Sequence, residues 1–374
     1  MDISLNIEER TLFSRLDLNL VMTILALNII GLINLYSATH GPNSVTMEPL
    51  FINQIVWLTV GWGIFFIFTL IDYSIASKAA IIIFILNMLA IVYTTFFGKI
   101  ALGAQRWIDF GFFKYQPSET MKLALIIIMA KFLASRSVTQ IGMGLRDLII
   151  PVLLIGIPCA FIIEQPDLGT AMTLAAIGST LIVFNKVRKA ILVVIAIMLA
   201  AGIWGAWNFM LHDYQKDRVR TFITPTSDPR GKGYNSIQSK IAVGSGQIFG
   251  KGFRKGTQSQ LEFLPERHTD FIYSVLSEEH GFVGSMITIG LFMTLFYVMI
   301  RIAMGARDKF GALLTVGVLG YLFWHMFVNM GMVMGLLPIV GVPLPLLSYG
   351  GSGMITTMTG LGLVSSVAFR RYLF

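Results

Sequence analysis

The feature that most constrains this chain is a succession of long apolar runs, nearly all joined by short polar connections. A hydrocarbon core about 30 Å thick needs about 20 mostly apolar residues for each helical crossing. A chain of 374 residues with 55% hydrophobic and only 13% charged residues is too apolar for a soluble globular protein. We therefore expect an all-α, polytopic membrane protein with about ten transmembrane helices, near residues 18–36, 52–71, 79–97, 117–134, 148–163, 168–184, 190–211, 271–300, 311–335 and 350–369.

The basic residues predict how these helices are oriented. The first ten residues, MDISLNIEER, are acidic where a cleaved signal peptide would need positive charge, so the first apolar run should remain as an anchor. With both termini in the cytoplasm, the short outer loops hold only Lys99, Arg106 and Lys114, as the positive-inside rule expects. The inner side then collects Arg10, Arg15, Lys78, Lys131, Arg136, Arg146, Lys186, Arg188, Lys189, Arg301, Arg307, Lys309, Arg370 and Arg371.

One long connection, residues 212–270, lies on the outer side by this count, between the seventh and eighth crossings of a single membrane domain spanning residues 1–374. It carries ten basic and six acidic side chains, a net charge of +4, and should attract anions. Contact of single lysines with lipid headgroups is the simpler explanation of this charge. A connection of this length is nonetheless usually functional. Within it, Ile237 and Ile241 share one side of a short helix that should lie against the membrane or the bundle.

Neither a zinc site nor a nucleotide site is indicated. The five histidines and the single Cys159 show no metal-ligand spacing. A divalent cation such as Mg or Mn, held by one carboxylate and a substrate phosphate, would leave no such trace. The glycine-rich run that starts at residue 231 does not match a phosphate loop. Ser245 stands where Gly is needed, and Gly252 follows Lys251 where Ser or Thr is required.

The stretch FLPERHTDFIYSVLSEEHG, residues 263–281, concentrates charge in an otherwise apolar region. The run from Gly281 to Ile300 already spans a bilayer, and helix-compatible residues extend it back to Phe271, with Asp270 at the outer tip. Asp270, or Thr269 before it, would alternatively serve only as the helix N-cap. Glu278 and Glu279 lie close to the hydrocarbon, where charge is costly, and therefore need partners.

Three further polar clusters fall at outer ends of helices. Pro117 suits a first helical turn, and Glu119 and Lys122 share the face that follows, either as a substrate contact or as a structural ion pair. The turn EQPDLGTA supplies Asp167. Three prolines in LLPIVGVPLPLLSYGGSGM exclude a straight helix, so this segment should dip or bend. Such a shape is permitted only where the segment is buried in protein or lines a cavity, and Ser348 would then be a polar group at that cavity. An ordinary helix-start turn is the alternative for Ser348.

Taken in order, these motifs resemble the signatures of the SEDS (shape, elongation, division, sporulation) family over essentially the whole chain. They are RWIDFG with YQPSETMKLA, QPDLGTA, GYNSIQSKIAVGSGQIFGKG, FLPERHTDFIYSVLSEEHG and LLPIVGVPLPLLSYGGSGM. The segment VGVPLPLLSYGGS is similar to the RodA-like, rod-shape branch, whereas the division branch, FtsW, usually differs just before this motif. Thr120, where relatives often carry Phe, is the departure from the pattern that we notice.

The resemblance implies a ten-helix peptidoglycan glycosyltransferase of the bacterial cytoplasmic (inner) membrane. Such enzymes polymerise lipid II into glycan strands and work with a class B penicillin-binding protein, and here also with other cell-elongation proteins, lipid-linked glycan and membrane lipids. No nucleic acid is expected. Carried over by motif, the essential acidic position falls on Asp270, the Glu-Lys pair on Glu119 and Lys122, and the third acidic position on Asp167.

The chemistry that the resemblance implies needs one base and a stabilised leaving group. The 4-hydroxyl of an acceptor sugar attacks the anomeric carbon of a lipid-pyrophosphate donor with a single inversion, so a carboxylate on the attacking side suffices as base. We assign that role to Asp270, and the pyrophosphate to cations or a divalent ion. The further candidates for substrate binding or support are Arg106, Lys122, Arg218, Arg220, Lys240, Arg267, His268 and Ser348.

Two other functions compete with this assignment. A flippase or transporter of lipid-linked precursors would place its ionisable groups near the bilayer midplane on broken helices. The strongest polar clusters here lie instead at outer helix ends, which favours chemistry on the outer face. A non-catalytic scaffold for cell-wall enzymes would tolerate the loss of Asp270.

Overall fold

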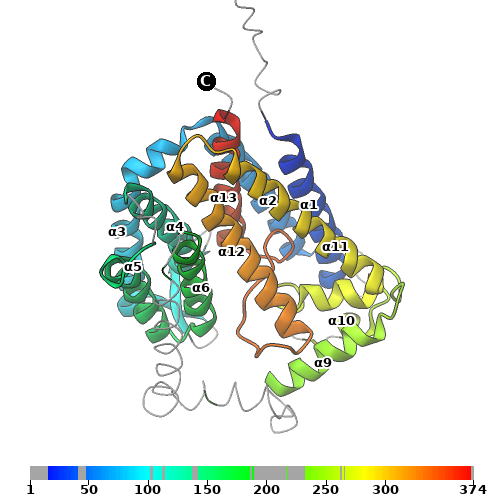
Figure 1. Cartoon of the computed structure of the whole chain (residues 1–374). Coiled ribbons are helices and arrows are strands. Elements are labelled where there is room, and N and C mark those ends of the chain that lie inside the picture. Colours follow the sequence, from blue (N-terminus) through cyan, green and yellow to red (C-terminus); the bar gives the residue numbers. More distant parts are fainter. Residues whose placement is uncertain are drawn as a thin grey trace, which may run out of the picture.

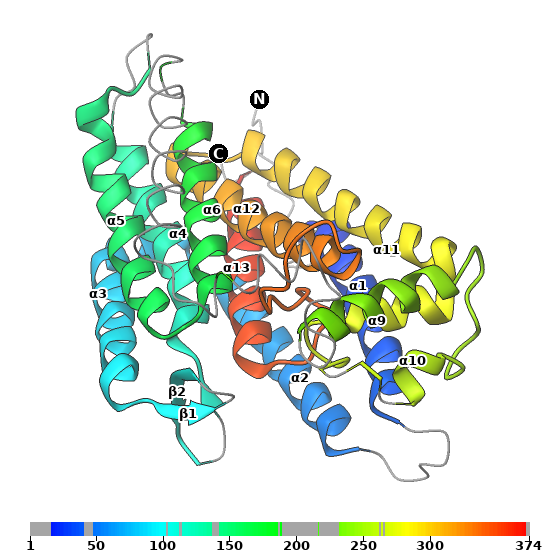
Figure 2. The same ribbon diagram turned by 90° about the horizontal axis from the view of Figure 1, so that it is seen from below.

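The computed structural model is a bundle of helices with one small β-sheet (Figure 1). Helices α1–α6 and α11–α13 form the main bundle. Two shorter helices, α9 and α10, lie beside the N-terminal part of α11 (Figure 2). The structure describes residues 16–40, 48–101, 104–111, 114–136, 142–185, 188, 216, 232–261, 263–264 and 266–371.

The element bounds follow the apolar runs closely. The strands are β1 (Lys99–Ala101), β2 (Ala104–Asp109) and β3 (Lys114–Tyr115). The helices are α1 (Leu18–Thr39), α2 (Pro49–Leu70), α3 (Tyr73–Phe97), α4 (Pro117–Ser135), α5 (Leu145–Glu164), α6 (Leu168–Phe184), α9 (Lys232–Ser245), α10 (Thr257–Gln260), α11 (Ile272–Met304), α12 (Lys309–Val333) and α13 (Gly351–Arg370).

Nine of the ten predicted crossings coincide with helices α1–α6 and α11–α13, and the tenth, 190–211, lies outside the described residues. Seven of these helices are long and apolar enough to cross a membrane, namely α1, α2, α3, α5, α11, α12 and α13. Helix α6 is a shorter apolar helix. The all-α, polytopic class is therefore confirmed. The small sheet was not expected from the sequence.

Aspartate caps set where several helices begin. Asp17, Asp72, Asp167 and Asp308 are the N-caps of α1, α3, α6 and α12, and each accepts a hydrogen bond from a backbone N–H of the following turn, at 2.6–3.3 Å. A cap of this kind contributes about 1 kcal/mol. Pro117 occupies the first turn of α4, as predicted, because a missing N–H costs nothing there.

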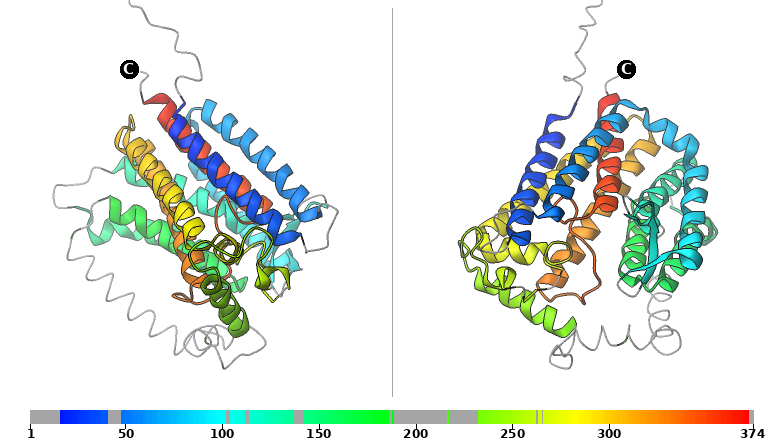
Figure 3. Two further views of the ribbon diagram at one scale, coloured as in Figure 1. Left: turned by 90° about the vertical axis from the view of Figure 1, so that its right-hand side faces the viewer. Right: turned by 180° about the vertical axis from the view of Figure 1, so that it is seen from behind.

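The helices divide into central and peripheral ones. In the spanning segments of α13 and α12, 78% and 67% of the residues are buried, against 17% in α2 and 11% in α3. The outer helices expose Ile, Leu and Phe side chains, which suits contact with lipid. Helix α13 packs closely on α2, and α12 contacts α4, α6 and α11. The two further views show α1, α2 and α13 side by side (Figure 3).

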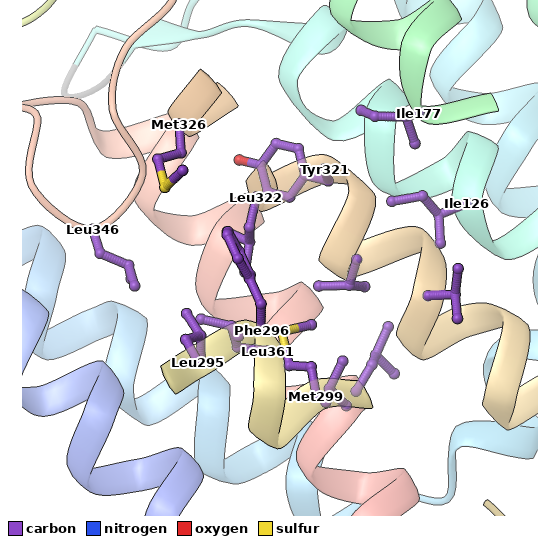
Figure 4. Close-up of a cluster of buried hydrophobic side chains, with 14 of the residues drawn as sticks. Ile126, Ile177, Leu295, Phe296, Met299, Tyr321, Leu322, Met326, Leu346 and Leu361 are labelled. Carbon is purple, nitrogen blue, oxygen red and sulfur yellow. The ribbon is translucent and has the colours of Figure 1, made fainter. Parts of the chain in front are cut away.

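Figure 4 shows part of the buried core, where side chains from five helices and one loop meet. Ile126 of α4 and Ile177 of α6 approach α12 from one side, and Phe296 of α11 approaches it from the other. Leu346, from the segment between α12 and α13, joins the same cluster. The core therefore connects the helices that carry the polar motifs.

We call one end of the bundle the loop end, because the sheet, α9, α10 and residues 334–350 lie there. Helices α2, α4, α6, α11 and α13 begin at this end, and α1, α3, α5 and α12 finish there. The sheet is antiparallel in the order β1-β2-β3 and connects α3 to α4, which pack against each other. All four polar motifs of the sequence therefore reach the same end of the molecule.

Helix α11 is interrupted at Gly281, whose φ of 64° and ψ of −158° are not helical. Its 33 residues correspond to about 50 Å, well beyond the hydrocarbon thickness, so the part before Gly281 projects from the spanning part. The predicted extension of the helix back to residue 271 is confirmed to within one residue.

The described part of the long loop is docked on the bundle. Helix α9 packs on α11 and α12 through small residues, and the Ser239 hydroxyl donates to the Val333 carbonyl at 3.2 Å. Ser236 and Ala242 lie on the same buried face, whereas Ile241 is exposed. The bundle therefore contacts the small side chains of α9, and Ile241 faces away from the bundle.

Candidate functional site

Asp270 lies in a turn, residues 266–271, directly before α11. The N-cap of α11 is Phe271, and no side chain caps this helix, so the interpretation of Asp270 or Thr269 as a mere N-cap is wrong. Asp270 is half-buried, and its carboxylate instead lies beside residue 341. A Cβ built on Gly341 would lie 3.2 Å from Asp270 Oδ2, and Gly341 has a φ of +74°. The glycine leaves space beside the carboxylate.

The backbone of this turn is held from two sides. From α12, Asn329 Nδ2 donates to the carbonyls of Asp270, at 2.8 Å, and Val342, at 2.7 Å. From the other side, the Ser348 hydroxyl donates to the Thr269 carbonyl at 2.7 Å. Because Asn329 is fully buried, these bonds fix the turn against the segment between α12 and α13.

Ser348 acts here as a connector between loops. Its hydroxyl also accepts from the Leu344 N–H at 2.8 Å, and its carbonyl accepts from Gln54 Nε2 at 3.3 Å. The predicted bend is present, because residues 334–350 contain no helix. Part of this segment lines a small cavity of about 30 Å³, whose walls are Glu119, Tyr321, His325, Pro343, Leu344, Pro345, Leu346, Ser348, Tyr349, Gly350, Gly353, Met354 and Thr357.

Arg267 and His268 support the same turn. Arg267 Nε donates to the carbonyl of Ala38, at the end of α1, at 2.7 Å. The His268 carbonyl accepts from the Tyr349 N–H at 2.9 Å. Burial lowers the pKa of His268, and the nearby Glu266 carboxylate, 3.8 Å from Nε2, opposes this only partly. His268 is therefore predominantly neutral at pH 7.

Glu119 and Lys122 form a buried ion pair at the start of α4. Lys122 Nζ lies 2.7 Å from Glu119 Oε1 and 3.0 Å from His325 Nε2, and the ammonium also sits 5.3 Å from the centre of the Tyr321 ring. Lys122 is only 1% exposed. Its three neighbours enclose it, so the geometry favours the structural ion pair over a contact with pyrophosphate. Glu119 Oε2 has no hydrogen-bond partner among the described residues and borders the cavity.

His325 is a site residue that the sequence analysis did not single out. It bridges Lys122 to the Pro343 carbonyl, which lies 3.3 Å from Nδ1. The cavity adjoins the Asp270 turn, because Ser348 and Tyr349 line it and also donate hydrogen bonds to carbonyls of this turn. A histidine in the middle of an apolar run was the available signal, but its partner is 203 positions away.

Arg106 and Asp167 meet at the same end of the bundle. Arg106 Nη1 lies 2.8 Å from Asp167 Oδ2, and Gln116 Nε2 donates to the same oxygen at 3.3 Å. The other Asp167 oxygen caps α6. This pair ties the sheet to α4 and α6.

The other basic residues predicted for the site are either exposed to solvent or outside the described residues. Lys240 on α9 is exposed, and its side chain lies against Gly335, which has no room for a Cβ. It therefore borders the segment that also carries Gly341. Arg218 and Arg220 lie outside the described residues.

Glu278 and Glu279 have partners, as predicted. The fully buried Glu278 carboxylate lies 2.7 Å from Lys251 Nζ and accepts the Gln258 N–H at 3.0 Å. Glu279 accepts the Ser37 hydroxyl at 2.6 Å. The Glu278 contacts attach the long loop to α11, and the Glu279 contact joins α11 to α1.

The described side chains alone do not form a metal centre. None of the described residues belongs to a group of three or more His, Cys, Asp or Glu that could hold a metal ion. A Mg or Mn ion beside Asp270 would have to take its other ligands from substrate phosphate and water. The divalent cation therefore stays a prediction, and no step is assigned to it.

Comparison with known proteins relates this arrangement to a family. The model of the FtsW/RodA/SpoVE family, described as cell cycle protein, matches residues 18–373. The peptidoglycan glycosyltransferase MrdB of Escherichia coli strain K12 is 40% identical over 356 residues, which cover 95% of this chain and 94% of MrdB.

Solved structures are similar over the same extent. A chain from a study of the structural coordination of polymerization and crosslinking by a peptidoglycan synthase complex has a TM-score of 0.81 and 29% identity, covering 96% of this chain and 99% of its own. The crystal structure of the rod shape determining protein RodA from Thermus thermophilus has a TM-score of 0.70 and 27% identity, covering 96% and 98%. With its matching motifs, its fold and a family match over almost its whole length, this chain belongs to the FtsW/RodA/SpoVE family.

Proposed function

We propose that this protein is a peptidoglycan glycosyltransferase that polymerises lipid II into glycan strands at the loop end of the bundle. The observation that carries the proposal is the fixed Asp270 turn beside a small cavity that Glu119 borders, in a chain similar to named peptidoglycan glycosyltransferases over nearly its whole length. The names MrdB and RodA among its relatives support a role in elongation and rod shape rather than in division.

In this mechanism, Asp270 is the base. Its carboxylate accepts the proton of the acceptor 4-hydroxyl as that oxygen bonds to the donor's anomeric carbon, and the bond from that carbon to the pyrophosphate oxygen breaks. The lipid pyrophosphate leaves, and the linkage inverts. Hydrogen bonds from Asn329 and Ser348 to the turn support this role because they hold the backbone that carries the carboxylate before substrate arrives.

The leaving group requires positive charge near Asp270. Lys240 is the best placed candidate, because it is exposed and lies against the same segment that faces Asp270. Arg267 is a second candidate, on the turn itself, although one of its nitrogens holds Ala38. Lys122 is enclosed, and we assign it a supporting role through Glu119 and His325.

The location follows from the charge distribution. We infer that the loop end faces outward from the bacterial cytoplasmic membrane and that both termini are cytoplasmic, since the basic connections lie at the opposite end. A crosslinking partner, a class B penicillin-binding protein, is supported by the similar chain from a synthase complex that coordinates polymerization with crosslinking.

The test replaces Asp270 with Asn in the full-length protein, purified with its crosslinking partner. Asp270→Asn should make no glycan from lipid II, because the amide cannot accept the proton, while folding and partner binding persist. The product is measured by gel separation of labelled glycan. The matched control is Glu266→Gln, which removes an exposed carboxylate from the same turn and should leave polymer length unchanged. Normal polymer from Asp270→Asn would overturn the proposed mechanism.

A further inference from the structure

The connection between α9 and α10 exposes large apolar side chains outside the candidate site. Ile248 is 60% exposed and Phe249 80% exposed, and we call these two residues the apolar tip. The connection that carries them lies beside α11 (Figure 2), to which it is hydrogen-bonded, and neither residue belongs to the cavity lining. An exposed pair of this kind needs a partner surface, because water is an unfavourable neighbour for it.

Hydrogen bonds at the break in α11 fix the position of the apolar tip along this helix. The N–H groups of Lys251 and Gly252 donate to the carbonyls of Glu278 and Glu279, both at 3.0 Å. On the other side of the break, the Phe282 N–H donates to the Gln247 backbone carbonyl at 2.8 Å, and the Val283 N–H donates to the Ile248 carbonyl at 3.0 Å. These bonds replace those that the helix loses at Gly281. The tip therefore cannot slide along α11.

The apolar tip lies level with the residues at which the membrane-spanning part of α11 begins. The uninterrupted apolar part of α11 begins at Gly281 and is long enough to span a bilayer. Its first exposed residues, Phe282 at 62% and Val283 at 40%, belong to the surface that must face lipid. Because the Ile248 carbonyl bonds directly to Val283, the apolar tip continues that lipid-facing surface sideways.

The charges next to the tip fit the same interpretation. Three basic residues follow within six positions, Lys251, Arg254 and Lys255. Lys251 is bound to Glu278, and Lys255 is exposed. Apolar side chains bordered by a cation are the pattern by which a segment inserts into the headgroup region of an anionic bilayer.

We propose that the apolar tip inserts into the lipid bilayer at the loop end, with Lys255 against the phosphate headgroups. The tip anchors α9 and the break of α11 at the membrane surface. If the proposed function is correct, this anchor also holds the Asp270 turn level with the pyrophosphate of a lipid-linked substrate. The insertion itself does not depend on catalysis, so its test uses a physical signal.

The experiment places a fluorophore at the tip of the full-length protein. The single cysteine is first removed by Cys159→Ala, and Phe249→Cys is labelled with an environment-sensitive dye in nanodiscs of phosphatidylethanolamine and phosphatidylglycerol. Lipids with a nitroxide near the top of the acyl chain should quench most of the fluorescence, and aqueous iodide should quench little. Ile248→Cys gives an independent measurement, and neither change removes a buried side chain.

The matched control is Glu266→Cys, an exposed site on the Asp270 turn, which iodide should quench. Iodide quenching without nitroxide quenching at both tip positions would overturn the proposal, because the tip would then lie in water. Loss of the nitroxide effect when the penicillin-binding partner is added would overturn it as well, because the surface would then be a protein interface. Normal glycan synthesis in either case would leave the proposed function intact.

Discussion

Gly341 determines how much space the Asp270 carboxylate has. We expect Gly341→Ala to lower the turnover of lipid II strongly, because the new Cβ would approach Asp270 Oδ2 to 3.2 Å. The φ of +74° adds about 1 kcal/mol of strain for a residue with a Cβ. Initial rates at saturating lipid II measure the effect, and a thermal unfolding curve confirms that the protein is folded.

Gly290→Ala is the matched control for this change. Gly290 lies within α11 with no atom near its missing Cβ, so alanine should leave the rate unchanged and stabilise the helix slightly. Equal rates for Gly341→Ala and the control would show that the carboxylate does not need this space.

Lys122 tests whether the Glu119–Lys122 pair is structural. Lys122→Met leaves the Glu119 carboxylate buried without its cation, which should cost about 3–5 kcal/mol of stability. Glu119→Gln combined with Lys122→Met should recover a large part of this loss, because both charges are then absent. Thermal unfolding midpoints of the single and double variants measure the coupling.

Lys131→Met, on the same helix but half-buried, is the control and should change the midpoint little. A Lys122→Met protein with a normal midpoint but no activity would indicate that Lys122 contacts substrate instead.

Among the elements, α11 carries the strongest conformational requirement. Gly281→Ala should destabilise the protein severely, because residue 281 has a φ of 64° and its Cβ would collide with the backbone of residues 246–250. Limited proteolysis should then cut the α9–α10 connection faster. Gly244→Ala, at an open position of α9, should leave the cleavage rate unchanged. Unchanged proteolysis of Gly281→Ala would mean that the loop does not depend on the break.

The elements differ in how far sequence predicts them. Nine apolar runs became helices because length and hydropathy are local properties. The buried Glu278 and Glu279 could be predicted to need partners, but not which ones, because Lys251 and Ser37 reach them only after folding. The same holds for His325, and for the break at Gly281, which depends on backbone bonds from a distant loop. The sheet, with strands of six residues or fewer, gave too short a pattern to recognise.

At the scale of the whole molecule, the bundle has two chemically different ends. The loop end holds Asp270, the cavity and the Arg106–Asp167 pair, and the opposite end holds basic connections such as Lys309, which donates to the Leu133 carbonyl at 2.9 Å. Lipid II polymerisation requires the first end to face away from the cytoplasm. The orientation is therefore a condition for the proposed function.

Cysteine labelling tests that orientation in the complete protein. In a Cys159→Ala background, Glu266→Cys should react with a membrane-impermeant maleimide in intact spheroplasts, because it is exposed at the loop end. Ser135→Cys, exposed at the opposite end of α4, should react only after lysis. The reverse labelling pattern would place Asp270 in the cytoplasm, where the growing glycan is absent, and no arrangement of the side chains around it could then support polymerisation on the outer face.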